Sequence, residues 1–220
     1  MRKLLYLFAL STIFIISCSE KPRLKIACVG DSLTYGLGVQ DITKDSYPAI
    51  LGQMMGDAYQ VRNFGSSRRT VINKGDYPYI NEKIYKEALK FNPDIVIIML
   101  GTNDTKPNNW VYKDDYKKDM ELLVESFQEL SSHPQIYLSY PLKSHIESIG
   151  HQGVSDSIIV SYIIPYINEI AQEYNLKVID SYTPMSNSPE LFPDGLHPNK
   201  EGNIILAKVI YKEITKNLKD

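Results

Sequence analysis

Short runs of apolar residues alternate along the chain with longer stretches in which apolar residues recur every three or four positions. The short runs predict strands, and the longer stretches predict helices. The run DIVIIML at 94–100 is apolar throughout, which is typical of a strand buried on both faces of a parallel sheet. Strands are expected at 24–29, 59–64, 94–100, 135–140 and 177–180, and helices at 47–55, 81–90, 112–130, 155–174 (kinked at Pro165) and 199–217.

This alternation predicts an α/β fold in which a five-stranded parallel sheet is flanked by helices. In such folds, ligands bind beyond the carboxyl ends of the strands. The composition agrees with one domain, because 220 residues with 43% hydrophobic content provide one sizeable core. The formal net charge is -2 and no basic stripe stands out, so nucleic acid is not an expected partner.

The first residues have the composition of an export signal. Arg2 and Lys3 precede an apolar run at 4–16, which ends at Ser17 and Cys18. A positive start, a short apolar run and a small residue before cysteine resemble a bacterial lipoprotein signal peptide. We therefore expect a signal peptide at 1–18 ending at lipidated Cys18, a tether at 19–23 and a folded domain at 24–220. The protein would then be lipid-anchored to a membrane of the bacterial cell envelope, on its periplasmic or surface face. The alternative is a plain signal peptide that is cleaved nearby.

The second cysteine, Cys28, falls inside the first expected strand. There it is expected to be a small buried apolar residue. With Cys18 lipidated, Cys28 has no partner for a disulfide. No cluster of Cys, His and Asp has the spacing of metal ligands, so neither a metal nor a cofactor is expected.

Polar turns that contain glycine follow the first three expected strands, and a fourth such turn opens the last helix. Because the carboxyl ends of parallel strands meet at one edge of a sheet, we expect these turns to lie close together. They are Gly30-Asp31-Ser32, Asn63-Phe64-Gly65, Gly101-Thr102-Asn103-Asp104 and Asp194-Gly195-Leu196-His197.

These turns contain the groups that an ester hydrolase requires: a nucleophile, a base, a group that orients the base, and donors for the oxyanion. Ser32 can be the nucleophile and His197 the base, because Asp194 stands three residues earlier and can accept from Nδ1. The backbone N–H groups of Ser32 and Gly65 and the side-chain amide of Asn103 can bind the oxyanion. The alternatives are a plain helix N-cap at Ser32 and a plain loop residue at Asn103.

The other histidines, His133, His145 and His151, are expected at the surface. His145 and His151 fall in a polar stretch at 142–153, which is expected to be a surface loop that could overhang the site.

The stretches VGDSLTYGLG, NFGSS, GTND and DGLHPN, in this order, resemble the blocks of the GDSL family of esterases and lipases, also called SGNH hydrolases. This resemblance implies a flavodoxin-like three-layer fold, with Ser32, Gly65, Asn103 and His197 as the four name-giving positions and Asp194 completing the triad. The intervening stretches DSYPAILGQMMGDAYQVRNFG and GTNDTKPNNW are similar to bacterial carbohydrate O-acetylesterases, including sialate and xylan types.

The chain departs from that resemblance after the second block. Where the group often has Ser-Gly, this chain reads Ser67-Arg68-Arg69-Thr70. Arg68 and Arg69 could bind a substrate carboxylate, as on a sialic or uronic acid, or could be a solvated helix start. Arginine in place of glycine here also puts the conformation of this loop in question, because arginine tolerates a positive φ poorly. Trp110 could stack on a sugar ring or be a packing aromatic.

The sequence thus predicts a serine esterase that removes O-acetyl groups from a carbohydrate, such as sialic acid or a plant or host glycan, through an acyl-enzyme. One alternative is a lysophospholipase or thioesterase on the same scaffold, which would require an apolar channel for a long acyl chain. Another is a glycan-binding lipoprotein without catalytic activity, although every catalytic position is filled.

Overall fold

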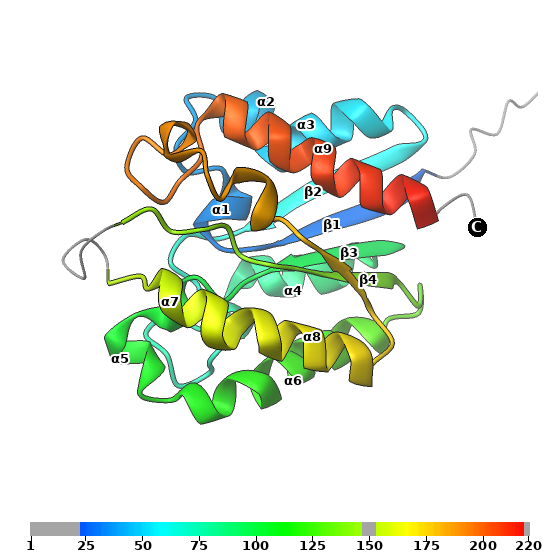
Figure 1. The fold of residues 1–220 in the computed structure, drawn as a ribbon. Helices are drawn as coiled ribbons and strands as arrows, with labels where there is room; N and C mark the ends of the chain where they lie inside the picture. Colours follow the sequence, from blue (N-terminus) through cyan, green and yellow to red (C-terminus); the bar gives the residue numbers. More distant parts are fainter. Residues whose placement is uncertain (1–22, 147–152, 218–220) are drawn as a thin grey trace, which may run out of the picture.

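The computed structural model describes residues 23–146 and 153–217 of the chain. The predicted signal peptide, Cys18 and His151 lie outside these ranges. The described part contains one sheet of five parallel strands in the order β2-β1-β3-β4-β5, which confirms the predicted α/β class (Figure 1). The strands are β1 (Leu24–Gly30), β2 (Tyr59–Gly65), β3 (Ile95–Met99), β4 (Gln135–Ser139) and β5 (Lys177–Ile179).

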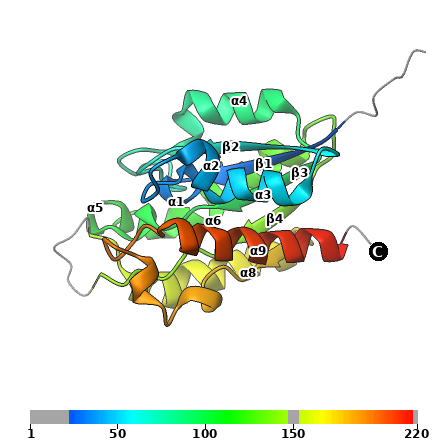
Figure 2. The ribbon, with the colours of Figure 1, turned by 90° about the horizontal axis from the view of Figure 1, so that it is seen from above.

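Helices cover both faces of the sheet, as Figures 1 and 2 show. On one face α3 packs against α9, and on the other lie α4, α6 and α8. Within the described residues, no helix is long and apolar enough to cross a membrane. The helices are α1 (Ser32–Tyr35), α2 (Ile42–Asp45), α3 (Tyr47–Met55), α4 (Lys83–Phe91), α5 (Pro107–Trp110), α6 (Tyr116–Gln128), α7 (Asp156–Ile158), α8 (Ile164–Glu173) and α9 (Lys200–Asn217).

The strands are apolar throughout because successive side chains enter two different cores. Ala27 and Val29 of β1 pack on the side of α4, α6 and α8, whereas Ile26 and Cys28 pack on the side of α3 and α9. All four are fully buried. Cys28 is a buried free thiol, as expected from its position in the strand.

The predicted helix at 155–174 is broken into three parts. A π-helical segment, Ile159–Ile163, separates α7 from α8, and Pro165 is the second residue of α8. Proline has no N–H group to donate to a carbonyl of the preceding helical turn. A π-helical turn is a common way to accommodate the missing hydrogen bond. The predicted surface loop at 142–153 also differs, because Leu142 is fully buried in the core beneath α9.

Candidate active site

The first of the expected site residues, Ser32, begins helix α1 directly after strand β1. Asp31 caps this helix, because its Oδ1 accepts a hydrogen bond from the Leu33 N–H at 2.9 Å. Gly30 permits the tight turn, since a Cβ atom there would lie 2.1 Å from Thr34 Oγ1. The turn holds Ser32 at the carboxyl end of the strand, with 5% of its surface exposed.

The structure brings Ser32, His197 and Asp194 into one hydrogen-bonded chain. Ser32 Oγ lies 2.9 Å from His197 Nε2, and His197 Nδ1 lies 2.6 Å from Asp194 Oδ2. Because a carboxylate only accepts hydrogen bonds, Nδ1 carries the ring proton and Nε2 is left to accept from the serine hydroxyl. The His197 ring is buried, so this chain of bonds is screened from solvent at its centre.

Asp194 is held by the same segment that it orients. Its Oδ1 accepts hydrogen bonds from the N–H groups of Leu196 at 2.9 Å and His197 at 2.7 Å. Burial alone would raise the pKa of the Asp194 carboxyl, but these hydrogen bonds and the one from the His197 ring lower it below its usual range. Asp194 is therefore ionised at neutral pH and can stabilise a protonated imidazole beside it.

Two other loops brace this segment. Gly38, with φ 107°, allows the loop after α1 to approach, since a Cβ there would lie 3.0 Å from His197 Cβ. His145 donates its N–H to the Gly195 carbonyl at 2.8 Å, and its ring lies 4.8 Å from that of Phe192. His145 is thus half-buried rather than at the surface, and burial lowers its pKa. Its packing role comes from tertiary contacts, for which the sequence gives no signal.

Asn103 lies in the turn after β3 and connects two parts of the site. Its Nδ2 donates to Asp31 Oδ2 at 3.1 Å and to the Arg69 carbonyl at 3.2 Å. Both distances are at the long end for N–H···O bonds, so this amide can exchange a partner for a ligand oxygen. The hydrogen bond between Asn103 and Asp31 joins the turn after β3 to the turn after β1. Burial raises the pKa of the Asp31 carboxyl to about 6.

Gly65 does not have the free N–H that the sequence led us to expect. Its N–H donates to Asn63 Oδ1 at 2.8 Å. A Cβ atom at Gly65 would lie 2.2 Å from the backbone nitrogen of Tyr35, so glycine is needed for close packing against α1. Shortly after Gly65 in the chain, the backbone N–H groups of 67–69 make no hydrogen bond with the residues that the structure describes. These N–H groups are free to donate to a ligand.

The segment after β2 is tied to the turn after β3 by a buried carboxyl. Asp104 Oδ1 accepts from the N–H groups of Val71 at 2.9 Å and Ile72 at 2.8 Å. Asn109 adds a second tie, because its Nδ2 donates to Asp76 Oδ1 at 3.0 Å. Burial raises the pKa of the Asp104 carboxyl to about 7. The sequence motif contains Asp104, but only the fold shows which segment it holds.

The two adjacent arginines have different environments. Arg69 forms an ion pair with Glu82, with its Nε 3.0 Å from Oε1, and also donates to the Ser67 carbonyl at 3.1 Å. Arg68 is exposed and has φ 72°, and its guanidinium lies 4.6 Å from the centre of the Tyr77 ring. Arg68 thus takes the left-handed backbone conformation that the sequence had put in question. Arg69, in contrast, is already paired and is a poorer candidate for substrate binding than expected.

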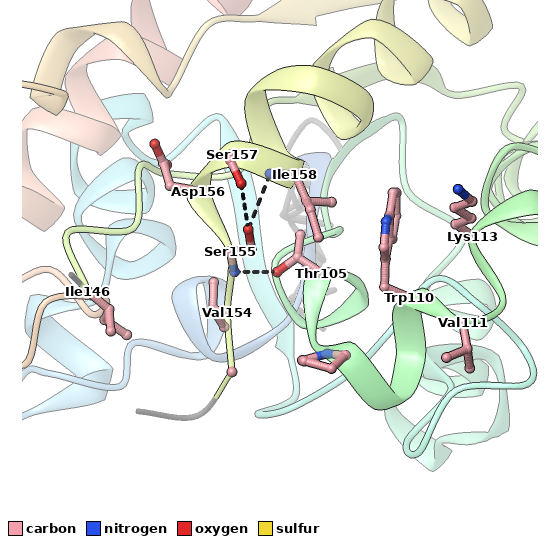
Figure 3. Close-up of a pocket in the computed structure, with 12 residues that line it drawn as sticks. Thr105, Trp110, Val111, Lys113, Ile146, Val154, Ser155, Asp156, Ser157 and Ile158 are labelled. Atoms are coloured by element: carbon pink, nitrogen blue, oxygen red, sulfur yellow. Dashed lines mark hydrogen bonds between the residues drawn. The ribbon is translucent and has the colours of Figure 1, made fainter. Parts of the chain in front are cut away.

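Trp110 lies at the edge of a cavity of about 670 Å³ beside the turn after β3 (Figure 3). Its ring contacts Tyr162 edge-on at 5.4 Å between ring centres. Thr105 and Pro107 also line the cavity. Trp110 is half-buried and packs against the core as well, so both roles suggested by the sequence agree with its position.

A parallel α/β sheet with a hydrogen-bonded Ser–His–Asp chain at the carboxyl ends of its strands is the arrangement of a serine hydrolase. The GDSL-like lipase/acylhydrolase family matches residues 28–204 of this chain. The chain belongs to this family.

Known relatives agree with this assignment. An acetylxylan esterase of Xylanibacter ruminicola is 37% identical over 210 residues, which cover 89% of this chain and 44% of that protein. The chain therefore spans less than half the length of this relative. Among solved structures, Est24, a carbohydrate acetylesterase from Sinorhizobium meliloti, matches with a TM-score of 0.70 and 19% identity over 88% of this chain and 99% of that one. The aryl esterase of M. smegmatis matches with a TM-score of 0.68 and 20% identity over the same shares of the two chains.

Proposed function

We propose that the chain is a carboxylic ester hydrolase that removes acetyl groups from a carbohydrate. The single observation that carries the proposal is the hydrogen-bonded chain from Ser32 Oγ through His197 to Asp194, with distances of 2.9 Å and 2.6 Å. The substrate class is supported by the similarity to an acetylxylan esterase and by the fold shared with a carbohydrate acetylesterase.

In the proposed reaction, Ser32 Oγ attacks the acetyl carbonyl carbon while its proton passes to His197 Nε2. As the tetrahedral intermediate collapses, the sugar oxygen leaves and takes that proton, which leaves an acetyl ester on Ser32. A water molecule then gives a proton to Nε2 and attacks this ester. Acetate leaves, the serine hydroxyl is restored, and Asp194 balances the charge on the imidazolium in both halves of the reaction.

The oxyanion requires donors near Ser32 Oγ. The Ser32 N–H at the start of α1 and Asn103 Nδ2 are two candidates that agree with the sequence-based prediction. For a further donor we favour an N–H of the turn 67–69 over Gly65, since the Gly65 N–H is already bound to Asn63. A left-handed residue in this turn, at Arg68, is a means of directing a backbone N–H toward a ligand.

The direct test is to measure acetate release from acetylated xylan and other acetylated glycans, with Ser32→Ala as the control. We expect release by the wild-type protein and none above background by the variant, which should still fold. Comparison of acetyl and octanoyl p-nitrophenyl esters separates this function from the lysophospholipase or thioesterase alternative. Preference for the octanoyl ester, or turnover that survives Ser32→Ala, would overturn the proposal.

We also propose, from the sequence of residues 1–18 alone, that the chain is exported and anchored through a lipid on Cys18. Cys18→Ser should move the protein from the membrane fraction to the soluble extracytoplasmic fraction when bacterial cells are fractionated. An unchanged distribution would contradict lipidation.

A further inference from the structure

A second cavity, of about 740 Å³, opens among the loops that follow β1, β2 and β3. These are the same loops that hold Ser32 and Asn103. The mechanism proposed above does not use the side chains in this cavity. Its lining consists of Leu37, Ser67, Arg68, Asp76, Lys106 and Asn108.

Hydrogen bonds place this cavity next to the candidate active site. The backbone N–H of Leu37 donates to the Ser32 carbonyl at 3.0 Å, and that of Lys106 donates to the Asn103 carbonyl at 3.3 Å. On the third side, Asn103 Nδ2 donates to the Arg69 carbonyl at 3.2 Å, directly after Arg68. Each of the three loops that line the cavity is therefore joined to Ser32 or Asn103 by a hydrogen bond.

Lys106 is the unusual residue of this cavity. Only 7% of its surface is exposed, yet its ammonium group makes no ion pair or hydrogen bond with the residues that the structure describes. Burial lowers the pKa of Lys106, the Asp76 carboxylate opposes this effect, and the positive charge of Arg68 adds to it. The Lys106 residue is buried as a whole, but its Nζ atom is not fully enclosed and the side chain lines the cavity. An anionic ligand in the cavity would give this ammonium group the ion pair that no described residue supplies.

Among the side chains that line the cavity, positive charges outnumber negative ones. The Arg68 guanidinium rests on the Tyr77 ring and, among the described residues, has no carboxylate partner. Asp76 contributes the opposing charge, but its Oδ1 is already bound to Asn109 Nδ2 at 3.0 Å. Two cations thus face one engaged carboxylate at the cavity wall. The carboxyls of Asp31 and Asp104, which also act on Lys106, accept hydrogen bonds from backbone N–H groups.

We propose that Lys106 and Arg68 form a subsite for the carboxylate of an acidic sugar, carried by the same carbohydrate whose acetyl group is removed at Ser32. This inference rests on the proposed esterase function and narrows its substrate to an acetylated acidic glycan. Among side-chain groups, guanidinium and ammonium bind carboxylates most strongly. Because Arg68 and Lys106 place these groups in a cavity beside Ser32, we expect the cavity to bind the carboxylate of an acidic sugar.

The proposal is tested with two matched pairs of substrates that differ only in the carboxylate. The first pair is an acetylated xylo-oligosaccharide bearing a uronic acid and its carboxyl-reduced form; the second is O-acetylated sialic acid and its methyl ester. The wild-type protein should prefer the charged member of at least one pair by about 10-fold or more in kcat/KM. The pair that shows this preference identifies the source of the carboxylate.

Lys106→Met, which keeps the apolar stem, and Arg68→Gln should each remove most of this preference by raising KM for the charged substrate. Lys106→Met should leave turnover of the neutral substrate nearly unchanged. For Arg68→Gln the readout is the ratio of kcat/KM for the charged substrate to that for the neutral one, because the backbone of Arg68 also belongs to the turn 67–69 that offers an oxyanion donor. The control is Lys83→Gln, which removes an equal charge from a highly exposed lysine on α4 and should leave the preference intact. Equal turnover of the charged and neutral members by the wild-type protein, or an equal loss on both in Lys106→Met, would overturn the subsite.

A binding measurement separates failure of the subsite from failure of the esterase. In calorimetry, Ser32→Ala should bind the charged oligosaccharide about 10-fold more tightly than its carboxyl-reduced form, and Lys106→Met in that background should abolish the difference. Acetate release without any binding difference refutes the subsite alone. A binding difference without acetate release from any substrate refutes the esterase and supports the subsite.

Discussion

The two halves of the candidate site, the segment 194–197 and the segment 65–76, are organised by different kinds of contact. In the first, every hydrogen bond of Asp194 comes from a residue two or three positions later in the chain. In the second, the ties come from Asp104 and Asn109, more than 30 residues away. The pairing of Asp194 with His197 is therefore set by contacts within the segment 194–197, although two other loops brace that segment. The segment 65–76 is instead positioned by the loop after β3.

This difference explains why one half can be recognised from a short motif and the other cannot. Asp194 and His197 must keep their residue types and spacing, because their side chains make the contacts. In the segment 65–76 the backbone N–H groups of Val71 and Ile72 bind Asp104, so these two side chains can change as long as the loop conformation is kept. Asp76 is an exception, because its carboxylate accepts from Asn109. Arg68 at φ 72° is also such a change: its backbone keeps a conformation typical of glycine, and its side chain lies over the Tyr77 ring and lines the second cavity.

The largest loss of activity is expected from changes in the segment 194–197. His197→Ala should lower kcat for an acetyl ester on the order of 10⁴-fold or more, because Ser32 loses its base. Combining it with Ser32→Ala should cause little further loss, since the two groups act as a unit. Single-turnover kinetics on p-nitrophenyl acetate measures both effects, with circular dichroism as a check of folding. Multiplicative losses in the double variant would show that the two residues act independently.

Asp194→Asn should reduce kcat by about 10³- to 10⁴-fold. Asparagine can still accept from the N–H groups of Leu196 and His197, but its NH₂ cannot accept from the ring, so the imidazole is held in the wrong tautomer. Steady-state kinetics at neutral pH measures this loss. A loss below 10-fold would show that the carboxylate is not needed to orient His197.

The pH dependence of stability sharpens this prediction. The pKa of Asp194 is lowered in the folded protein, so its ionised form stabilises the fold above the ordinary value of 3.8, and this contribution is lost as the pH falls through the still lower folded value. The stability that the wild type has over Asp194→Asn through this carboxylate should therefore persist down to about pH 5 and shrink only below about pH 4. A difference that already collapses near pH 6 would contradict it.

The sequence predicted all five strands and the Ser32–His197–Asp194 grouping for the same physical reason. Apolar runs such as 94–100 and the spacing of Asp194 and His197 are local patterns, and the parallel order of the sheet brings their ends together. The long helix at 155–174 was predicted in extent but not in its π-helical break, because the response to Pro165 depends on how the flanking turns pack.

The features that were not predicted depend on contacts between distant segments. Gly65 matches the family motif, yet only the fold shows that Asn63 binds its N–H and that α1 packs against its Cα. Lys106 lies in the stretch GTNDTKPNNW, but the sequence did not predict that it is buried without an ion-pair partner, because three loops that are separate in the sequence create that environment. Leu142 was placed in a surface loop because its neighbours are polar, although the residue itself is buried.

Gly65→Ala tests the structural role of this glycine in the second half of the site. The added Cβ would meet backbone atoms of α1 at 2.2 Å and 2.6 Å, which cannot move without shifting the helix. The expected loss of unfolding free energy is about 1–3 kcal/mol, measured by urea denaturation. The control is Gly52→Ala in α3, where the nearest atom is 3.5 Å away and the substitution should be neutral or stabilising. Equal stability of Gly65→Ala and wild type would refute the close packing.

The smallest effect concerns the backbone at Arg68. Arg68→Gly and Arg68→Ala both remove the guanidinium, but only glycine adopts φ 72° without a steric penalty. Arg68→Gly should therefore be more stable than Arg68→Ala by about 1 kcal/mol, which urea denaturation of the two variants resolves. Because the side chain is lost in both, any difference between them in turnover of a neutral acetyl ester reports the position of the backbone N–H groups of 67–69. Equal stability and equal turnover would show that this turn is not held in the left-handed conformation in solution, and the further oxyanion donor would then have to come from another part of the site.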